Sequence, residues 1–516
     1  MKKEIMEFNG KNKSICNFSA RKKALFKSLK QMKSWSKSSE KIAHKLNFTA
    51  ILTIMIALIA MLPVSLNAMS FDAGEMGRME INGAIKASFG ATQYLDFVDD
   101  YDKGDDADFD ATRELGVKIQ WILNKNLKGV ASFQIGEGST GGYFGSTDAL
   151  VGGEEDGDLI VELDNLYIDY TTDGGINFKV GSQSFGMAEI GYGSNIFYEV
   201  PAGVTFKAPF SESAAIQAGW FRMADLMDDS ETNTDDQADF MFAKLPFTIN
   251  NITFTPWAAF ALIEEDVIRN APSHWRYAYF NYPGFLSGSH SAITDPMPID
   301  DVTAYYAGAS LGINFNDALS LKTSLTYGSM EWETATVDTT IAGFFADVVI
   351  DYKMGIFTPE LFALYSNGPD ANDEDLDMMP ILIGGPTYTS SYFGGSRFND
   401  NMFDSYDTTC AASMWAAGFK LKDIKTGERL THEFQVMYAQ GTADENLFQA
   451  PDDILLNEDE SLVEINFNSD FQVMKNLVFA TELGYISFDE DEDYNEAIGG
   501  TVEDFWKVAA ALELMF

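Results

Sequence analysis

The 516-residue chain contains 78 acidic and 35 basic residues, which gives a formal net charge of −43. The charge is uneven, because the first 47 residues hold 13 of the basic residues and only three of the acidic ones. From Asp72 onward the chain therefore carries 75 acidic against 22 basic residues. Such a surface repels nucleic acid, so we exclude a nucleic-acid partner.

The N-terminal part has the order of a secretory signal. Basic residues precede the apolar stretch Phe48–Leu62, and small residues follow it up to Ala68. We expect cleavage after Ala68, so that residues 1–68 form a basic extension with a signal peptide and residues 69–516 are exported. An uncleaved inner-membrane anchor is the alternative, although the stretch is shorter than the about 20 residues that span a bilayer.

The exported part alternates apolar and polar residues in segments of about ten residues. Residues 79–89 and 114–121 place every second residue, such as Ile81, Ile85 and Trp121, on an apolar face. This alternation predicts strands with an apolar outer face and a polar inner face. No segment after the signal is as long as a transmembrane helix, so in a membrane these strands have to close into a barrel.

Eight short turns rich in Asn, Asp and Gly alternate with nine long polar loops, which implies 18 strands. The turns lie at residues 124–126, 172–175, 209–213, 250–251, 314–317, 353–355, 423–428 and 469–475. We predict an all-β fold, a single transmembrane antiparallel β-barrel of 16–18 strands with short periplasmic turns and long outer loops. Segments 79–89 and 505–516 should pair to close it. A soluble sandwich or propeller is the alternative, but neither requires such regular alternation of short and long connections.

The third long loop, residues 183–202, differs from the others. It is rich in aromatic residues and glycine, and Glu189 and Glu199 are its only charged residues. This composition suits a loop packed inside a barrel, and a less polar outer loop is the alternative. A loop inside the barrel would set Glu189 and Glu199 opposite lysines of the wall and create a transverse field at the constriction. The candidate wall residues are Lys86, Lys118, Lys128 and Lys179.

Catalytic and metal sites are not indicated by the sequence. The acidic runs, such as 99–110 and 370–377, do not match the calcium-loop pattern and are better interpreted as solvated loops. His432 starts an alternating strand, but no G-x-S-x-G motif occurs and the sequence cannot place a serine beside it. HExxH and CxxC motifs are also missing. We therefore expect no enzyme, no metal and no cofactor.

The last segment, residues 506–516, has an apolar face that ends in Phe516. It resembles the C-terminal strand of bacterial outer-membrane proteins, in which a final aromatic residue is part of the signal read by the barrel assembly machinery. The resemblance implies that this machinery is a partner of the chain.

Several stretches together resemble the outer-membrane homotrimeric porins of anaerobic sulfate-reducing bacteria. They are Leu245–Ala259, Phe362–Ile383, Leu430–Thr442 and Phe505–Phe516. The resemblance implies a homotrimer in the outer membrane, in contact with lipid and lipopolysaccharide, that carries solutes passively and has no catalytic residues.

The expected function is a general diffusion porin for ions and small hydrophilic solutes, with a preference for cations because of the acidic loops. A substrate-specific channel, or a closed structural or adhesive barrel, is the alternative. A specific channel should carry aromatic residues along its lumen. The aromatic residues that the alternation places on strands fall mostly on the lipid face, which favours the general porin. They are Trp121, Phe133, Phe434, Phe467 and Tyr485.

Overall fold

The structure is a computed structural model. The chain separates into two units, Met1–Ser65 and Leu66–Phe516, and the described residues all belong to the second unit. The predicted extension and signal, residues 1–68, lie outside them. The described residues are 69–72, 74, 77–93, 108–136, 149–150, 160–187, 192–193, 196–225, 237–264, 299–334, 338–370, 377–382, 386–398, 411–444, 456–489 and 504–516.

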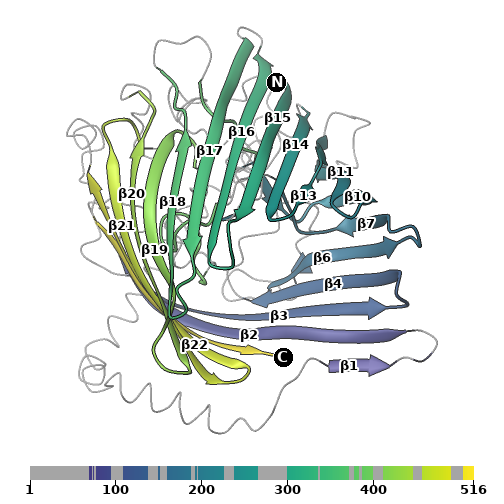
Figure 1. Cartoon of the computed structure of the whole chain (residues 1–516), viewed down its shortest axis with the longest axis horizontal. Coiled ribbons are helices and arrows are strands. Elements are labelled where there is room, and N and C mark those ends of the chain that lie inside the picture. Colours follow the sequence, from purple (N-terminus) through teal and green to yellow (C-terminus); the bar gives the residue numbers. More distant parts are fainter. Residues whose placement is uncertain are drawn as a thin grey trace, which may run out of the picture. The chain divides into compact units, whose positions relative to one another are not determined.

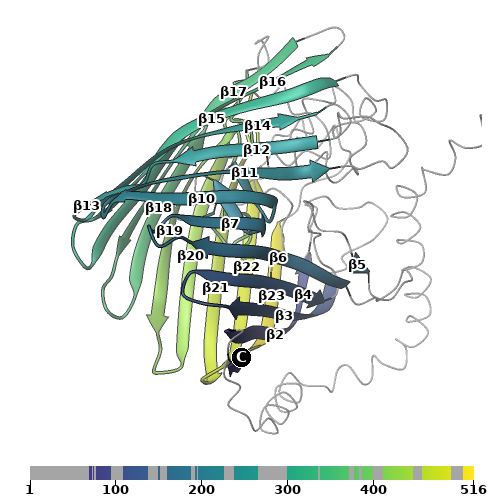
Figure 2. The same cartoon turned by 90° about the vertical axis from the view of Figure 1, so that its right-hand side faces the viewer.

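Eighteen long strands of this part form one closed antiparallel barrel, and they follow one another around the wall in chain order (Figures 1 and 2). They are β2 (Arg78–Gln93), β3 (Asp108–Ile122), β4 (Leu127–Gly136), β6 (Ile160–Thr171), β7 (Asn177–Ser182), β10 (Ala202–Ser211), β11 (Ala214–Asp225), β12 (Gln237–Lys244), β14 (Ile252–Ile263), β15 (Ile299–Asn314), β16 (Leu319–Thr334), β17 (Asp338–Tyr352), β18 (Thr358–Ser366), β19 (Met414–Lys425), β20 (Leu430–Gly441), β21 (Ser461–Met474), β22 (Leu477–Asp489) and β23 (Phe505–Met515). Two short strands, β1 (Met69–Asp72) and β5 (Ala149–Leu150), pair with wall strands, and β13 (Phe247–Ile249) continues β12 between β11 and β14. β8 (Phe185–Met187) and β9 (Phe197–Glu199) form a separate hairpin.

Closure joins the first long strand to the last. β2 pairs with β3 on one side and with β23 on the other, from Ala84 opposite Met515 to Gln93 opposite Trp506. The predicted pairing of 79–89 with 505–516 and the predicted count of 16–18 strands are both confirmed. A closed sheet has no free edge strand, which excludes the sandwich and the propeller.

The short turns form where the sequence places residues suited to them. Asn124 and Asn316 each accept two backbone N–H groups through their side-chain oxygen, as Asx turns do. Gly175, Gly355 and Asn250 have positive φ angles of 85°, 84° and 54°, which glycine and asparagine adopt at low cost.

The two faces of the wall differ as the alternation predicts. On β18, Glu360 is 1% exposed and faces inward, whereas the next residue, Leu361, is 56% exposed and faces outward. Other outward residues, such as Leu325 and Tyr327, are also large, apolar and more than half exposed. Contact between such an apolar face and the lipid of a bilayer has no free-energy cost, whereas exposure of the same face to water is unfavourable. Among the described residues no helix is long and apolar enough to cross a membrane.

We predict that Leu325→Arg, in the middle of an outward face, destabilises the barrel by about 2–4 kcal/mol in a bilayer, because a guanidinium near the bilayer midplane loses its hydration. The measurement is the free energy of unfolding by urea from lipid vesicles. Ile356→Arg is the control, because Ile356 is 66% exposed in a short turn, where the cost should fall to about 0–1 kcal/mol. Equal effects of the two substitutions would contradict a lipid-facing wall.

Candidate functional site

The described part of the third long loop lies inside the barrel. Its β8–β9 hairpin packs on inward-facing aromatic residues of β11 and β12. The Phe185 ring lies 4.7 Å from that of Phe221 and 4.4 Å from that of Phe242, and Phe197 stacks on Phe240 at 4.7 Å. Because these side chains are almost fully buried, the hairpin is a fixed part of the lumen.

A second loop also enters the lumen, from the connection between β18 and β19. We call residues 386–398 the inner segment. Glu464, an inward residue of β21, accepts hydrogen bonds from Ser391 N at 2.9 Å, from Tyr392 N at 3.3 Å and from Thr389 Oγ1 at 2.6 Å. A carboxylate that accepts several bonds inside a protein binds its donors strongly, so Glu464 anchors the middle of the inner segment.

The end of the inner segment has its own anchors. Glu482 on β22 accepts hydrogen bonds from Ser396 Oγ at 2.7 Å and from Arg397 N at 2.9 Å, and it forms an ion pair with Lys507 at 3.2 Å. The Arg397 guanidinium makes a bidentate contact with Asp470, with distances of 2.5 and 2.9 Å. Lys507 is itself bonded to a carbonyl oxygen of the inner segment. The buried charges of Glu482 and Lys507 therefore compensate each other, as burial requires.

Glycines in the wall let the loop backbone approach closely. A Cβ atom at Gly484 would overlap with a hydroxyl of the inner segment, one at Gly343 would lie 2.6 Å from Met379 N, and one at Gly328 would lie 2.9 Å from Pro380 Cγ. Each of these glycines occupies an inward position of its strand. The wall is thus shaped for the loop as well as bonded to it.

Tyr192 joins the two internal loops to each other and to the wall. Its carbonyl oxygen accepts a 2.6 Å hydrogen bond from Thr387 N, and its hydroxyl donates to Glu360 on β18. The Lys420 ammonium lies 3.6 Å from the centre of the Tyr192 ring and 3.6 Å from Glu360. Burial, and then the Glu360 carboxylate, raise the pKa of Tyr192, which keeps its hydroxyl protonated as a donor.

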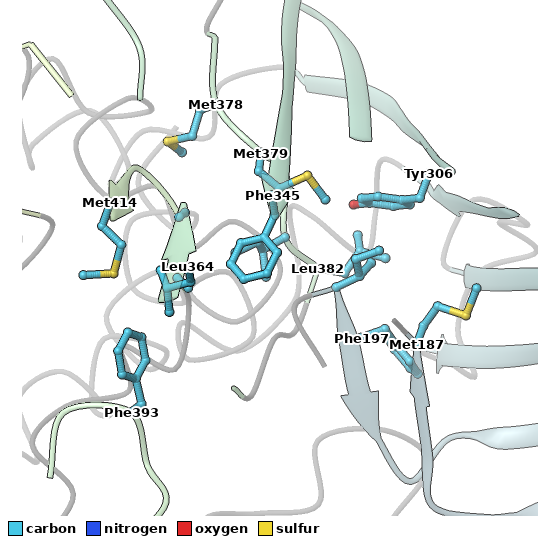
Figure 3. Close-up of a cluster of buried hydrophobic side chains, with 14 of the residues drawn as sticks. Met187, Phe197, Tyr306, Phe345, Leu364, Met378, Met379, Leu382, Phe393 and Met414 are labelled. Carbon is cyan, nitrogen blue, oxygen red and sulfur yellow. The ribbon is translucent and has the colours of Figure 1, made fainter. Parts of the chain in front are cut away.

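Apolar side chains fill the space around this junction. Figure 3 shows Leu382 between Phe345 of β17 on one side and Met187 and Phe197 of the hairpin on the other. Leu382, Met187 and Phe197 are 0% exposed and Phe345 is 1% exposed. The two loops and the inner faces of β11–β23 therefore form one hydrophobic core inside the barrel.

Of the two carboxylates predicted to line the constriction, the structure describes only Glu199. Glu189 lies outside the described residues. Glu199 lies on β9, where its side chain accepts a 3.2 Å hydrogen bond from Val200 N. Burial raises the pKa of Glu199 to about 7, and this bond opposes the shift.

The four predicted lysines face inward on neighbouring strands, and they are Lys86, Lys118, Lys128 and Lys179. Lys86 forms an ion pair with Glu114 at 3.3 Å, and Lys128 pairs with Asp169 at 3.1 Å. Lys179 lies 5.3 Å from the centre of the Tyr167 ring. Within the described part of the chain none of the four lysines pairs with Glu199, so the predicted transverse field stays a prediction.

The structure places a serine beside His432, the one histidine among the described residues. His432 Nδ1 lies 2.7 Å from Ser469 Oγ on the outward face, and the imidazole stacks on Phe467. Ser469 is in the middle of the ladder between His432 and Thr481, so no turn there offers backbone donors for an oxyanion. No carboxylate among the described residues orients the imidazole, and the pair has no feature of a nucleophilic site beyond its hydrogen bond.

The inner segment was missed from the sequence, which treated the connection around the acidic run 370–377 as a solvated loop. The signal was present, because residues 386–396 contain aromatic, hydroxyl and glycine residues without a charge. The third loop was singled out by the same composition. The inward aromatic residues of the wall, such as Phe221, Trp257 and Phe345, were missed as well.

No family model matches the chain, and no curated protein matches it. Solved structures with a similar arrangement include OccAB3 of Acinetobacter baumannii, at 10% identity and a TM-score of 0.49, covering 84% of this chain and 99% of that one. OprD of Pseudomonas aeruginosa aligns at 13% identity and a TM-score of 0.46, covering 87% and 99%. OpdQ of the same organism aligns at 8% identity and a TM-score of 0.46, covering 85% and 98%. Identities and TM-scores this low carry no conclusion about function.

We predict that Glu464→Ala frees the inner segment, because three donors lose a charged acceptor and each such bond contributes about 1.5–3 kcal/mol. Amide hydrogen exchange at Ser391 and Tyr392 should accelerate, while the wall strands stay protected. Glu80→Ala is the control, since Glu80 forms an ion pair with Arg78 of its own strand β2. Unchanged exchange in Glu464→Ala would show that the carboxylate is not an anchor.

We predict that the hairpin loses stability as the pH rises from 5 to 8. The pKa of Glu199 is raised in the folded protein to about 7, so folding favours its neutral form. Stability from this group is therefore complete below the unfolded pKa and is lost as the pH rises through about 7. The urea midpoint should fall over this range in the native protein but less in Glu199→Gln. Glu212→Gln, in an exposed turn, should keep the native pH dependence.

Proposed function

We propose that the protein is a channel of the bacterial outer membrane through which ions and small hydrophilic solutes diffuse passively. The closed barrel with an apolar outer face supports a membrane location, since irregular or open structures cannot span lipid. A diffusion channel needs a polar passage through the barrel.

The observation that carries the proposal is a polar wall on strands outside those that carry the described anchors of the inner segment. Those anchors lie on β17 (Asp347, which accepts from the Tyr388 hydroxyl), on β20 (Gln435, which accepts from Ser390 N) and on β21–β23, whereas the polar wall is the inner face of β2, β3, β4, β6, β7 and β10, and it begins next to β23. Its side chains are polar on consecutive strands and partly reached by solvent. They include Asn82, Lys86, Glu114, Lys118, Gln120, Lys128, Ser132, Asn165, Asp169, Asn177, Lys179 and Lys207. We propose that solutes pass between this polar wall and the internal loops.

We further propose that the channel prefers cations over anions. We expect the acidic runs of the long loops, such as 99–110 and 370–377, to surround the entrance, and fixed negative charge within about 8 Å of an ion's path concentrates cations at physiological salt. The lysines of the polar wall oppose this effect. Their field is weakened because Lys86 and Lys128 each have a carboxylate partner, Glu114 and Asp169, so the entrance charge should dominate.

A substrate-specific channel is the second candidate, and the inward aromatic residues favour it. Phe221, Phe240, Phe242, Trp257 and Phe362 all face the lumen, whereas the sequence alone indicated aromatic residues mainly on the lipid face. Stacked aromatic side chains offer binding surface to the apolar faces of a solute. Since the hairpin already covers several of these rings, the general channel remains our first proposal.

We also propose that residues 1–68 are removed on export, that the protein forms a homotrimer in contact with lipopolysaccharide, and that the barrel assembly machinery inserts it. These proposals come from the signal-like N-terminus and from the resemblance of the sequence to homotrimeric porins. N-terminal sequencing and the native mass of the protein from outer membranes test them directly.

We predict that the purified protein gives steady, ohmic current steps in a planar lipid bilayer. A silent bilayer with correctly folded protein would contradict the channel and support a closed structural barrel. Current that one solute class blocks at saturating concentration, while solutes of equal size do not, would favour the specific channel instead.

We predict that Glu114→Gln combined with Asp169→Asn shifts the reversal potential in a KCl gradient toward chloride, because two lysines of the polar wall lose a compensating carboxylate. Asp173→Asn is the matched control, since Asp173 faces Lys125 at 3.9 Å in an exposed turn. A reversal potential that is equal in all three proteins would show that ions do not pass along the polar wall.

A further inference from the structure

The junction of β2 and β23 closes the barrel, and we call it the seam. It contains a contact in addition to the ladder of paired residues of these two strands. Beyond the last ladder pair, Ala84 with Met515, Gly83 and Phe516 exchange two backbone hydrogen bonds, and both are 2.8 Å long. By the alternation of their strands, both residues face outward, toward lipid. The Phe516 ring therefore lies across the seam, over the position where Gly83 has no side chain.

Gly83 is shaped for this ring. A Cβ atom at Gly83 would lie 2.6 Å from Phe516 Cζ, and it would also overlap with the carbonyl oxygen of Gly116 on β3. Real Cβ atoms do not make contacts this short, so any other residue would displace the ring or the neighbouring strand. By contrast, a Cβ atom at Gly129, an outward glycine of β4, would have no atom within 4 Å.

The strand β1 completes the same edge. It pairs with β2 from Met69 opposite Ile81 to Asp72 opposite Arg78, directly beyond Phe516. β23 and β1 run in the same direction along β2 and meet end to end beside Asn82. The edge of β2 that β23 leaves open is thereby covered, and an uncovered edge in or near lipid would leave backbone groups without partners.

We infer that Gly83 is the packing site, or seat, of the Phe516 ring. This contact, which we call the joint, stabilises the closed barrel against unfolding. Phe516 is expected from the sequence to be read by the assembly machinery. The joint gives the same side chain a second, structural role that persists after assembly and does not depend on any other protein. It also does not depend on whether the lumen conducts.

Refolding without the assembly machinery separates the two roles. The protein is purified from membranes, unfolded in urea and refolded into vesicles of short-chain phosphatidylcholine, and its unfolding rate is followed by heat-dependent gel mobility. Phe516→Ala should unfold about tenfold faster than the native protein. Phe471→Ala is the control, because Phe471 is an outward aromatic residue, 41% exposed, away from the seam. Equal rates for Phe516→Ala and Phe471→Ala would leave Phe516 as a recognition signal only and overturn the joint.

A double-mutant cycle tests the seat itself. Gly83→Ala should accelerate unfolding, Gly129→Ala should not, and Gly83→Ala should have a smaller effect in the Phe516→Ala background, because contacting residues are not additive. Additive effects would overturn the seat. If the variants do not refold, amide exchange in the native protein decides. Gly83 and Phe516 amides as slow as those in the middle of β2 support the joint, and amides as fast as those of the short turns refute it.

Discussion

The structure depends on one constraint, the need of every backbone N–H and C=O group in a lipid environment for a partner within the protein. A sheet meets it only when its first strand bonds to its last, and here β2 and β23 do so over ten consecutive pairs. Closure in turn separates two environments. Outward positions must be apolar, and inward positions can hold ionised groups, provided that each has a partner.

The ionised groups of the inner wall have their partners on the internal loops as well as on neighbouring strands. Glu464 and Glu482 on β21 and β22 are almost fully buried, and their bonds go to Ser391, Ser396 and Lys507. On β2 and β3, which follow β23 around the wall, Lys86 and Glu114 compensate each other and stay partly exposed. The barrel therefore has one side where carboxylates bind protein and one side where charged groups remain open to water and ions.

The strands could be predicted from the sequence because their signal is local. Alternation marks the face of each residue, and Asn124 or Gly175 marks a turn without any distant contact. The internal loops could be predicted only in part, because the partner of Ser390 is Lys507, 117 residues away. The composition of residues 386–396 resembles that of 183–202, but no local pattern identifies Glu464 as its anchor. The proximity of His432 to Ser469 likewise depends on strand register, which alternation does not determine.

The anchoring of the inner segment to five separate wall strands also orders the events of folding. Its partners Asp347, Glu464 and Lys507 lie on strands from β17 to β23. The complete set of wall residues that bind the inner segment therefore exists only after the last strand has joined the sheet. Contacts between residues so far apart in sequence are expected to form late. The entropy lost on closing such long loops is offset only when all the binding contacts of the wall are present. We therefore expect the lumen to narrow only after the wall has closed.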